Sequence, residues 1–285
     1  LVAPYVTIPL GYGVIFQGIV AENMTANGMP IEMIEVWPHT IILGAGMLVG
    51  LIGSWWFFRK PRDYQDISLE GISLEDEAIR LNKDHIVSLI AIAGVLFGQL
   101  YWDSMPLGAL LGILIMIIGG AVKLRNSDGT IAEGIRLMGM VSFIMLIAGG
   151  YAYVVNQTGA VDTLIDATLA ILGASKVVFV IVLIIIGLLI TMGIGTSFGT
   201  IPVIALFYVP MCMKMNMSVG ATACLIACAA ALGDAGSPAS DSTLGPTSGL
   251  NADGQHDHIW DTCVPTFFFY NLPLAIAGFI GGMIL

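Results

Sequence analysis

Long runs of apolar residues, separated by short polar segments, make up most of the chain. A helix that crosses about 30 Å of hydrocarbon needs about 20 mostly apolar residues. Runs near that length occupy 40–58, 86–102, 107–122, 177–213, 215–233 and 264–285, and shorter ones occupy 1–20, 137–155 and 160–174. The pattern predicts an all-α polytopic membrane protein.

The composition agrees with this pattern and excludes several classes of partner. Hydrophobic residues make up 57% of the chain and charged residues 11%, which lies outside the range of soluble domains. The net charge is -10, but many of the acids lie in one mixed-charge segment, 63–84, which is typical of a solvated loop. We therefore expect the lipid bilayer, and no nucleic acid, as the partner of this chain.

Basic residues predict which side of the membrane the loops face. The segment 59–85 contains Arg59, Lys60, Arg62, Arg80 and Lys83. Short cytoplasmic loops carry an excess of Lys and Arg, so this loop is predicted to be cytoplasmic. The predicted location is a bacterial inner membrane, crossed several times.

The apolar run 177–213 is too long for one span, because an uninterrupted helix of that length would measure about 55 Å. Three glycines, several hydroxyl residues and Pro202 interrupt it between 193 and 202. Glycine and proline disfavour regular helix. We therefore predict two half-helices that meet at an unwound centre, where the candidate site residues are Thr196, Ser197, Gly199 and Thr200.

A four-residue polar segment, 156–159, joins the two shorter runs 137–155 and 160–174, and a basic residue flanks the pair on each side. Basic residues at both ends favour a re-entrant hairpin that enters and leaves on the cytoplasmic side. Asn156 and Thr158 would then lie at its tip. The alternative is a full span at 137–155 followed by an interfacial helix.

Two carboxylates, Asp234 and Asp241, directly follow the uncharged run 215–233, within the stretch GDAGSPASDST. An ionised Asp in hydrocarbon costs about 2.5–3.5 kcal/mol on insertion scales, so such residues usually line a wet cavity or bind a ligand. The alternative is that both lie among the lipid headgroups. We favour a functional site, because hydroxyls and glycines surround the acids where an interfacial anchor would have Lys or Arg.

This stretch has the chemistry of a site for a hard cation. Pro238 removes a backbone hydrogen bond and frees carbonyl oxygens, and oxygen is the ligand that hard cations such as Na⁺ prefer. A buried carboxylate in such a pocket can hold either a proton or Na⁺, and competition for one site is sufficient for antiport. The predicted ligands are Asp234 and Asp241, supported by Ser237, Ser242 and Thr243.

A second polar cluster, His256-Asp257-His258, contains residue types that bind metals. The spacing is common by chance, so a solvated loop or a proton relay is the preferred interpretation. An intramembrane metalloenzyme is the least favoured function. We predict no enzymatic activity and no cofactor, with Na⁺ and H⁺ as transported or coupling ions.

A weak internal repeat is visible in the loops and prolines. Asn27-Gly28 followed by Trp37-Pro38 echoes Asp253-Gly254 followed by Val264-Pro265. We predict one transmembrane transport domain over 1–285. In it, 1–58 ends a first repeat that begins before Leu1, 59–134 holds the cytoplasmic loop and connecting helices, and 135–285 forms a second repeat.

Several motifs together resemble the NhaC-type Na⁺/H⁺ antiporters of the ion transporter superfamily. They are Gly233-Asp234, Ser237-Pro238, Ser240-Asp241-Ser242-Thr243, His256-Asp257-His258-Ile259 and Thr196-Ser197-Phe198-Gly199-Thr200. The resemblance implies inverted repeats, re-entrant hairpins and an ion site where hairpin tips meet broken helices. Ala235 and Gly236 stand where these antiporters tend to have a His-Cys pair, and related branches resemble proposed amino-acid carriers, histidine among their substrates.

Na⁺/H⁺ exchange is the function that the motifs favour, with Asp234 and Asp241 alternately holding Na⁺ or H⁺. The alternative is Na⁺- or H⁺-coupled symport of a small amino acid or carboxylate, whose carboxylate Asn156 and Thr158 would help to hold. A passive channel fits midplane carboxylates and broken helices less well. The sequence leaves a homodimer open.

Overall fold

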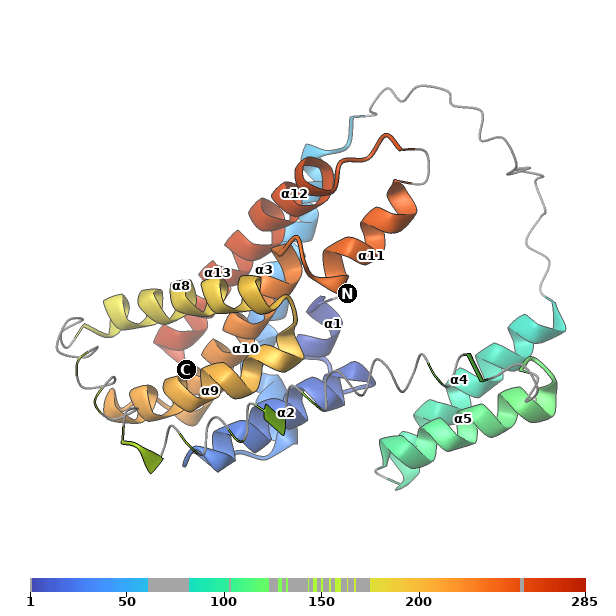
Figure 1. The fold of residues 1–285 in the computed structure, drawn as a ribbon, viewed down its shortest axis with the longest axis horizontal. Coiled ribbons are helices and arrows are strands. Elements are labelled where there is room, and N and C mark those ends of the chain that lie inside the picture. The colour runs from blue at the N-terminus through green and yellow to red at the C-terminus, as the bar shows by residue number, and fades with distance from the viewer. Residues whose placement is uncertain are drawn as a thin grey trace. The chain divides into compact units, whose positions relative to one another are not determined.

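The computed structural model describes residues 2–60, 82–102, 104–122, 175–251 and 254–285, and scattered positions between 128 and 167. Within these ranges all regular elements are helices (Figure 1). Six of them are long and apolar enough to cross a membrane. The prediction of an all-α polytopic membrane protein is confirmed.

Two compact units account for the helices. The smaller, within Ser68–Ser142, contains α4 (Lys83–Trp102) and α5 (Met105–Gly119), and the larger comprises Leu1–Ile67 and Phe143–Leu285. The helices of the larger unit are α1 (Val2–Thr7), α2 (Tyr12–Ala26), α3 (Met33–Phe57), α8 (Lys176–Ile194), α9 (Ser197–Lys214), α10 (Val219–Gly236) and α11 (Asp241–Leu250). A final helical run consists of η2 (His258–Cys263), α12 (Val264–Thr266), η3 (Phe267–Asn271) and α13 (Leu272–Ile284), of which η2 and η3 are π-helical.

Glycines bring α4 and α5 together as an antiparallel pair. A Cβ added at Gly98 would lie 2.8 Å from the Cα of Gly108, and one added at Gly119 would lie 2.3 Å from Val87. Ser104 precedes α5, which begins with Met105-Pro106, and proline suits the first turn of a helix because it has no N–H to satisfy. The short connection between α4 and α5 therefore joins two antiparallel helices.

Helix α10 is the centre of the larger unit and is buried along its length. It packs against α8, α9, α13 and α3. Small residues allow the close approach of α13, since a Cβ added at Gly278 would lie 2.2 Å from the Sγ of Cys228 and one at Gly281 would lie 2.4 Å from that of Cys224. These two cysteines therefore pack as small side chains.

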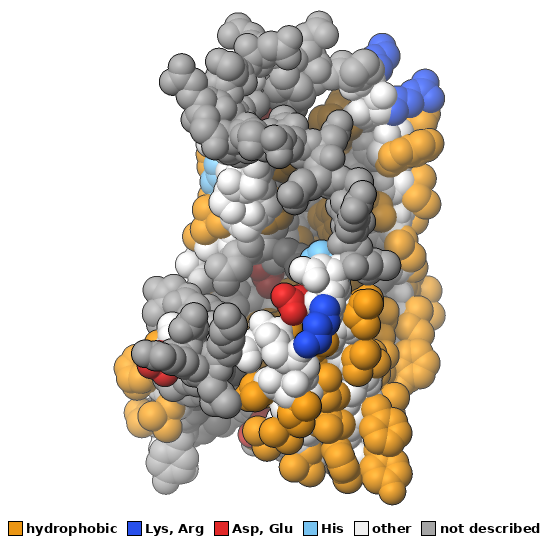
Figure 2. All heavy atoms as spheres, turned by 90° about the vertical axis from the view of Figure 1, so that its right-hand side faces the viewer, with side chains coloured by type: hydrophobic (Ala, Val, Ile, Leu, Met, Phe, Trp, Pro, Cys, Tyr) orange, Lys and Arg blue, Asp and Glu red, His pale blue; other side chains and the backbone are white. Residues whose placement is uncertain are grey.

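The outer surfaces of the helices are apolar. Ile185 and Leu189 of α8 are 51% and 65% exposed, and Trp55 and Trp56 near the end of α3 are 71% and 64% exposed. Apolar side chains cover much of the coloured surface in Figure 2, with few charges between them. Such a surface is expected where lipid is the solvent.

The break predicted within 177–213 lies at Gly195 and Thr196, but the two helices that flank it fold back on each other. Gly195 has a φ of 76°, which glycine adopts without strain, and it ends α8. The Tyr208 hydroxyl of α9 donates to the carbonyl of Leu183 in α8, so α9 returns alongside α8. The predicted pair of half-helices is therefore corrected to a hairpin of two helices that are each long enough to cross a membrane, because the left-handed glycine reverses the chain.

Both outer ends of this hairpin lie at one end of the bundle. The Lys176 Nζ at the start of α8 donates to the carbonyl of Met283 at 3.3 Å. A short turn joins α9 to α10, where the Ser218 hydroxyl donates to the carbonyl of Leu285 at 2.8 Å. The turn of the hairpin lies at the other end of α10, beside Ala239, whose carbonyl oxygen would be 3.1 Å from a Cβ added at Gly195.

A second break separates α10 from α11 over residues 237–240, as the proline and glycines of this stretch predicted. The run from His258 to Ile284 is antiparallel to α10, and Asn271, at its middle, contacts Gly236. The half that precedes Asn271 continues beyond the end of α10 and contacts α11, where Thr247 and Thr262 hydrogen-bond at 2.9 Å. Asp234 therefore lies level with the middle of a long helix, a position that favours the membrane interior over the headgroups.

Helices α1 and α2 are interrupted in a similar way. Residues 8–11, including Pro9, separate them, and Gly11 has a φ of 57°. The same order of features occurs twice along the chain. Two helices separated by a break come first, a loop with a glycine of positive φ follows, and a long helical run that contains a proline comes last. The matching residues are Pro9, Gly28 and Pro38 in the first half and Pro238, Gly254 and Pro265 in the second.

Candidate functional site

The carboxylate of Asp234 lies in the last turn of α10, and the side chain is 6% exposed. Its Oδ2 accepts hydrogen bonds from the Tyr5 hydroxyl at 2.6 Å and the Ser197 hydroxyl at 2.7 Å, and from the Ser197 N–H at 3.4 Å. Its Oδ1 accepts from the hydroxyls of Ser240 and Ser242, the latter at 3.0 Å. Four hydroxyls and one backbone N–H, all neutral, thus surround one buried carboxylate.

Three separate helix ends bring these donors to Asp234. Ser197 is the first residue of α9, Ser240 precedes α11 and caps it by accepting from the Ser242 N–H at 3.0 Å, and Tyr5 lies in α1. Helix N-termini carry partial positive charge and favour an anion nearby. The carboxylate of Asp234 occupies that position for both α9 and α11.

The remaining hydroxyls of the break hold the backbone in place. The Ser237 hydroxyl donates to the carbonyl of Met192 in α8 at 3.1 Å, and the Thr243 hydroxyl lies between the carbonyls of Ser237 and Ser240. Gly233 allows α8 to approach, because an added Cβ would lie 2.2 Å from the backbone of Thr191. These contacts fix where Ser240 and Ser242 begin α11.

The structure brings together only some of the predicted site residues. Asp234, Ser197 and Ser242 meet directly, while Ser237 and Thr243 support them through the backbone. The predicted role for Thr200 as an ion ligand is not supported, since its hydroxyl donates to the carbonyl of Thr196 one turn earlier. Gly199 is buried in the first turn of α9 and Thr196 is half-buried before it.

Three predicted site residues cannot be placed beside Asp234. Asp241 begins α11, but its side chain lies outside the described part of the chain, as does Asn156. Thr158 lies in an exposed turn, and its N–H donates to the carbonyl of Val154 at 3.2 Å. The re-entrant hairpin over 137–174 falls mostly outside the described residues and stays a prediction.

Tyr5 and Ser240 contact Asp234 but were not among the predicted site residues. Tyr5 packs against the rings of Phe16 and Phe198, at centroid distances of 5.2 and 5.6 Å. One signal was available for Tyr5, because it precedes Pro9 by the same four positions by which Asp234 precedes Pro238. Ser240 belonged to the hydroxyl-rich stretch and is a usual helix-capping residue type.

The histidine cluster forms a hydrogen-bonded network that ends at the break. His258 contacts the carbonyl of Pro238 through Nε2 and the hydroxyl of Thr247 through Nδ1, both at 2.8 Å. Thr247 contacts Thr262, which contacts His256 Nε2 at 2.7 Å. In the described part of the chain no three His, Cys, Asp or Glu side chains gather as a metal site would require. The network ties η2 to α11 and to the break.

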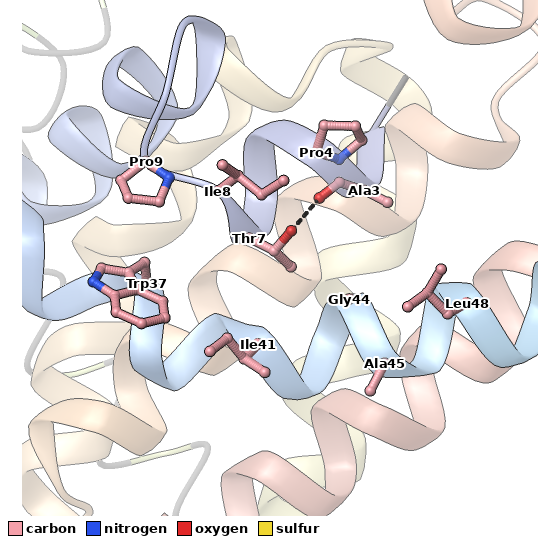
Figure 3. A pocket seen from close by; sticks show the side chains of 10 residues that line it. All are labelled: Ala3, Pro4, Thr7, Ile8, Pro9, Trp37, Ile41, Gly44, Ala45 and Leu48. Atoms are coloured by element: carbon pink, nitrogen blue, oxygen red, sulfur yellow. Dashed lines mark hydrogen bonds between the residues drawn. The ribbon is translucent and has the colours of Figure 1, made fainter.

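A separate cavity of about 560 Å³ lies between α1 and α3 (Figure 3). Apolar side chains and prolines make up most of its lining, together with Thr7, whose hydroxyl donates to the carbonyl of Ala3 at 2.7 Å. None of the residues that line it is charged. The lining of the cavity therefore lacks the charged group and the cluster of hydroxyls of an ion site. Asp234 and its surroundings supply both.

Comparison with known proteins supports an ion carrier. The family model described as the Na⁺/H⁺ antiporter family matches residues 1–279. A Bacillus subtilis protein named "Putative amino acid transporter YuiF" is 46% identical over 292 residues, and uncharacterized membrane proteins of Vibrio parahaemolyticus and Haemophilus influenzae are 45% and 42% identical over 289 and 295 residues. Each alignment covers 100% of this chain and 65% of the relative, so the chain spans about two thirds of the length of these proteins. No solved structure matches.

Proposed function

Because this chain belongs to the Na⁺/H⁺ antiporter family, a family of multi-pass membrane proteins with bacterial members, we propose that the protein containing it exchanges Na⁺ for H⁺ at Asp234. The observation that carries the proposal is one buried carboxylate surrounded by hydroxyl oxygens, inside a bundle of apolar helices. The expected location is the bacterial inner membrane, with the loop 59–85 in the cytoplasm.

The groups at Asp234 suit both ions. Na⁺ is a hard cation that prefers oxygen ligands, and the carboxylate with the hydroxyls of Ser197, Ser240 and Ser242 supplies oxygen alone. Each hydroxyl has lone pairs in addition to its hydrogen, so it can turn from donating to the carboxylate to coordinating a cation. A proton needs one carboxylate oxygen and an acceptor, which the same hydroxyls provide.

Exchange follows because the two ions exclude each other. Either one neutralises Asp234, and a carboxylate that holds a proton has lost the charge that attracts Na⁺. Loading Na⁺ on one side of the membrane therefore releases a proton, and loading a proton on the other side releases Na⁺. Alternating access would come from relative movement of the elements that meet at Asp234, namely α1, the α8–α9 hairpin and the α10–α11 break.

Coupled uptake of an amino acid is the second candidate. It is favoured by the name of the Bacillus subtilis relative, "Putative amino acid transporter YuiF". In this case Na⁺ or H⁺ at Asp234 would be the coupling ion. Ion flux would then depend on the amino acid.

Proteoliposomes that contain the full-length protein test both candidates. An imposed Na⁺ gradient should change the internal pH without any amino acid, and Asp234→Asn should abolish the change. Asp84→Asn, at an exposed position in the first turn of α4, is the matched control and should transport like the wild type. Flux that appears only with an amino acid would favour symport, and unchanged flux in Asp234→Asn would refute the assignment of the site.

A further inference from the structure

The hydroxyls of Tyr5 and Ser197 each have more acceptors within reach than hydrogens to donate. The Tyr5 oxygen lies 2.6 Å from Asp234 Oδ2 and 3.0 Å from Ser197 Oγ. Ser197 Oγ lies 2.7 Å from the same Oδ2 and 3.0 Å from the carbonyl oxygen of Ala230. Because each hydroxyl carries one hydrogen, the four oxygens allow alternative arrangements of two hydrogen bonds.

Two arrangements keep both hydroxyl hydrogens in hydrogen bonds. They differ in how many of these hydrogen bonds Asp234 Oδ2 accepts. In the closed arrangement Tyr5 and Ser197 both donate to Oδ2, which is then fully occupied. In the open arrangement Tyr5 donates to Ser197 Oγ and Ser197 donates to the Ala230 carbonyl. Oδ2 then keeps only the Ser197 N–H at 3.4 Å, and no heavy atom has moved.

We propose that Tyr5 and Ser197 form a hydroxyl switch that opens Asp234 Oδ2 to Na⁺ or to a proton. The inference rests on the proposed ion exchange at Asp234. The closed arrangement holds the empty, charged carboxylate with the protein's own donors. The open arrangement belongs to the loaded carboxylate, and the change between them is rotation about two C–O bonds, with no proton passed between the groups.

Tyr5 is a positioning residue in this scheme and acts as an internal competitor of the ion. Its hydrogen bond to the charged carboxylate is exchanged for one to a neutral hydroxyl when an ion binds. Hydrogen bonds to charged groups are stronger than neutral ones by an amount that corresponds to about fivefold to tenfold in an equilibrium constant. Removing the Tyr5 hydroxyl should therefore strengthen the binding of Na⁺ and of the competing proton by about this factor.

The relay through Ser197 makes a second, more specific prediction. In Ser197→Ala the Tyr5 hydroxyl has no alternative acceptor, so it gives up its hydrogen bond altogether when Na⁺ enters. The gain in Na⁺ affinity from Tyr5→Phe should therefore be larger in a Ser197→Ala background than in the wild type. Tyr5 and Ser197 are in contact, so their effects can couple with either sign. The switch requires one sign, a larger gain in the Ser197→Ala background, and a smaller gain there would contradict it.

Calorimetric titration of the purified full-length protein with NaCl, with choline chloride as the blank, measures these effects without transport. Tyr12→Phe is the matched control, because its ring lies 6.2 Å from that of Phe198 in the same aromatic cluster and it does not contact Asp234. The expected result is tighter Na⁺ binding in Tyr5→Phe, a larger gain in the Ser197→Ala background, and no change in Tyr12→Phe. Unchanged or weaker binding in Tyr5→Phe would overturn the switch. Na⁺-driven proton flux in wild-type proteoliposomes tests the exchange separately, so failure of exchange and failure of the switch are distinguishable.

Discussion

Tyr5 and Asp234 hydrogen-bond to each other at 2.6 Å, and each stands four residues before the proline of a helix break. Contact between equivalent positions of two repeats is expected where an approximate two-fold axis passes between them. A second pair behaves in the same way, because Gly46 and Pro273 stand eight residues after Pro38 and Pro265, and a Cβ added at Gly46 would lie 2.8 Å from the Pro273 carbonyl oxygen.

Other contacts around the breaks recur at equivalent positions within each half. Thr7 ends α1 and faces Gly44, while Gly236 ends α10 and faces Asn271. Gly44 and Asn271 each stand six residues after the proline of the long helix, and Thr7 and Gly236 each stand two residues before the proline of the break. The register supports the predicted pair of repeats, and it places a phenol in one repeat where the other has the carboxylate.

The Na⁺ concentration for half-maximal flux should depend on pH. A proton that competes for Asp234 weakens Na⁺ binding as the pH falls, by up to about tenfold per pH unit for one proton. Proteoliposome flux measured over a series of pH values checks this, and a pH-independent half-saturation would contradict competition at one carboxylate.

Asp241→Asn should lower Na⁺-driven proton flux if Asp241 is the second predicted ligand. Its position at the first residue of α11, directly after Ser240, places it in the same helix start that contacts Asp234. The flux of Asp241→Asn is measured beside that of Asp234→Asn in proteoliposomes. If Asp241→Asn transports at the wild-type rate, the ion site is limited to Asp234.

His258→Ala should weaken Na⁺ binding by up to about tenfold through loss of one hydrogen bond that positions the break. The side chain contacts the Pro238 carbonyl, and without it the start of α11 is less firmly held. Calorimetric titration with NaCl measures the change. His85→Ala, at an exposed position in the first turn of α4, is the control, and equal affinities in the two variants would contradict a positioning role.

Gly233→Ala should lower the free energy of unfolding by about 1–3 kcal/mol, because the added methyl group has no room beside α8. The melting temperature of the purified protein should fall accordingly. Gly193→Ala introduces the same group in the last turn of α8, where nothing lies within 4 Å, and should leave the melting temperature nearly unchanged. The melting temperature of each variant in detergent provides the comparison, and equal values would mean that α8 can move away at little cost.

The sequence was sufficient to predict most of the membrane-spanning helices, the positions of both breaks and the burial of Asp234, because lipid demands long apolar runs and because an acid in such a run is conspicuous. It did not predict that α9 returns beside α8, since glycine and proline mark where a helix ends but not the direction in which the next one leaves. Tyr5 was missed because a tyrosine in an apolar run is usually read as packing, and its hydroxyl meets Asp234 only through the arrangement of α1 against α10.

The attachment of the α8–α9 hairpin has a mechanical consequence. Its outer ends are tied to the end of the last helix through Lys176 and Ser218, whereas the opposite end carries Ser197 to Asp234. A hairpin that pivots about these outer ends would have an arm of about 27 Å, the length of an 18-residue helix, between the pivot and Ser197. Tilting such an arm by about 5° moves its tip by roughly 2 Å, which is enough to break the hydrogen bond of Ser197 to the carboxylate.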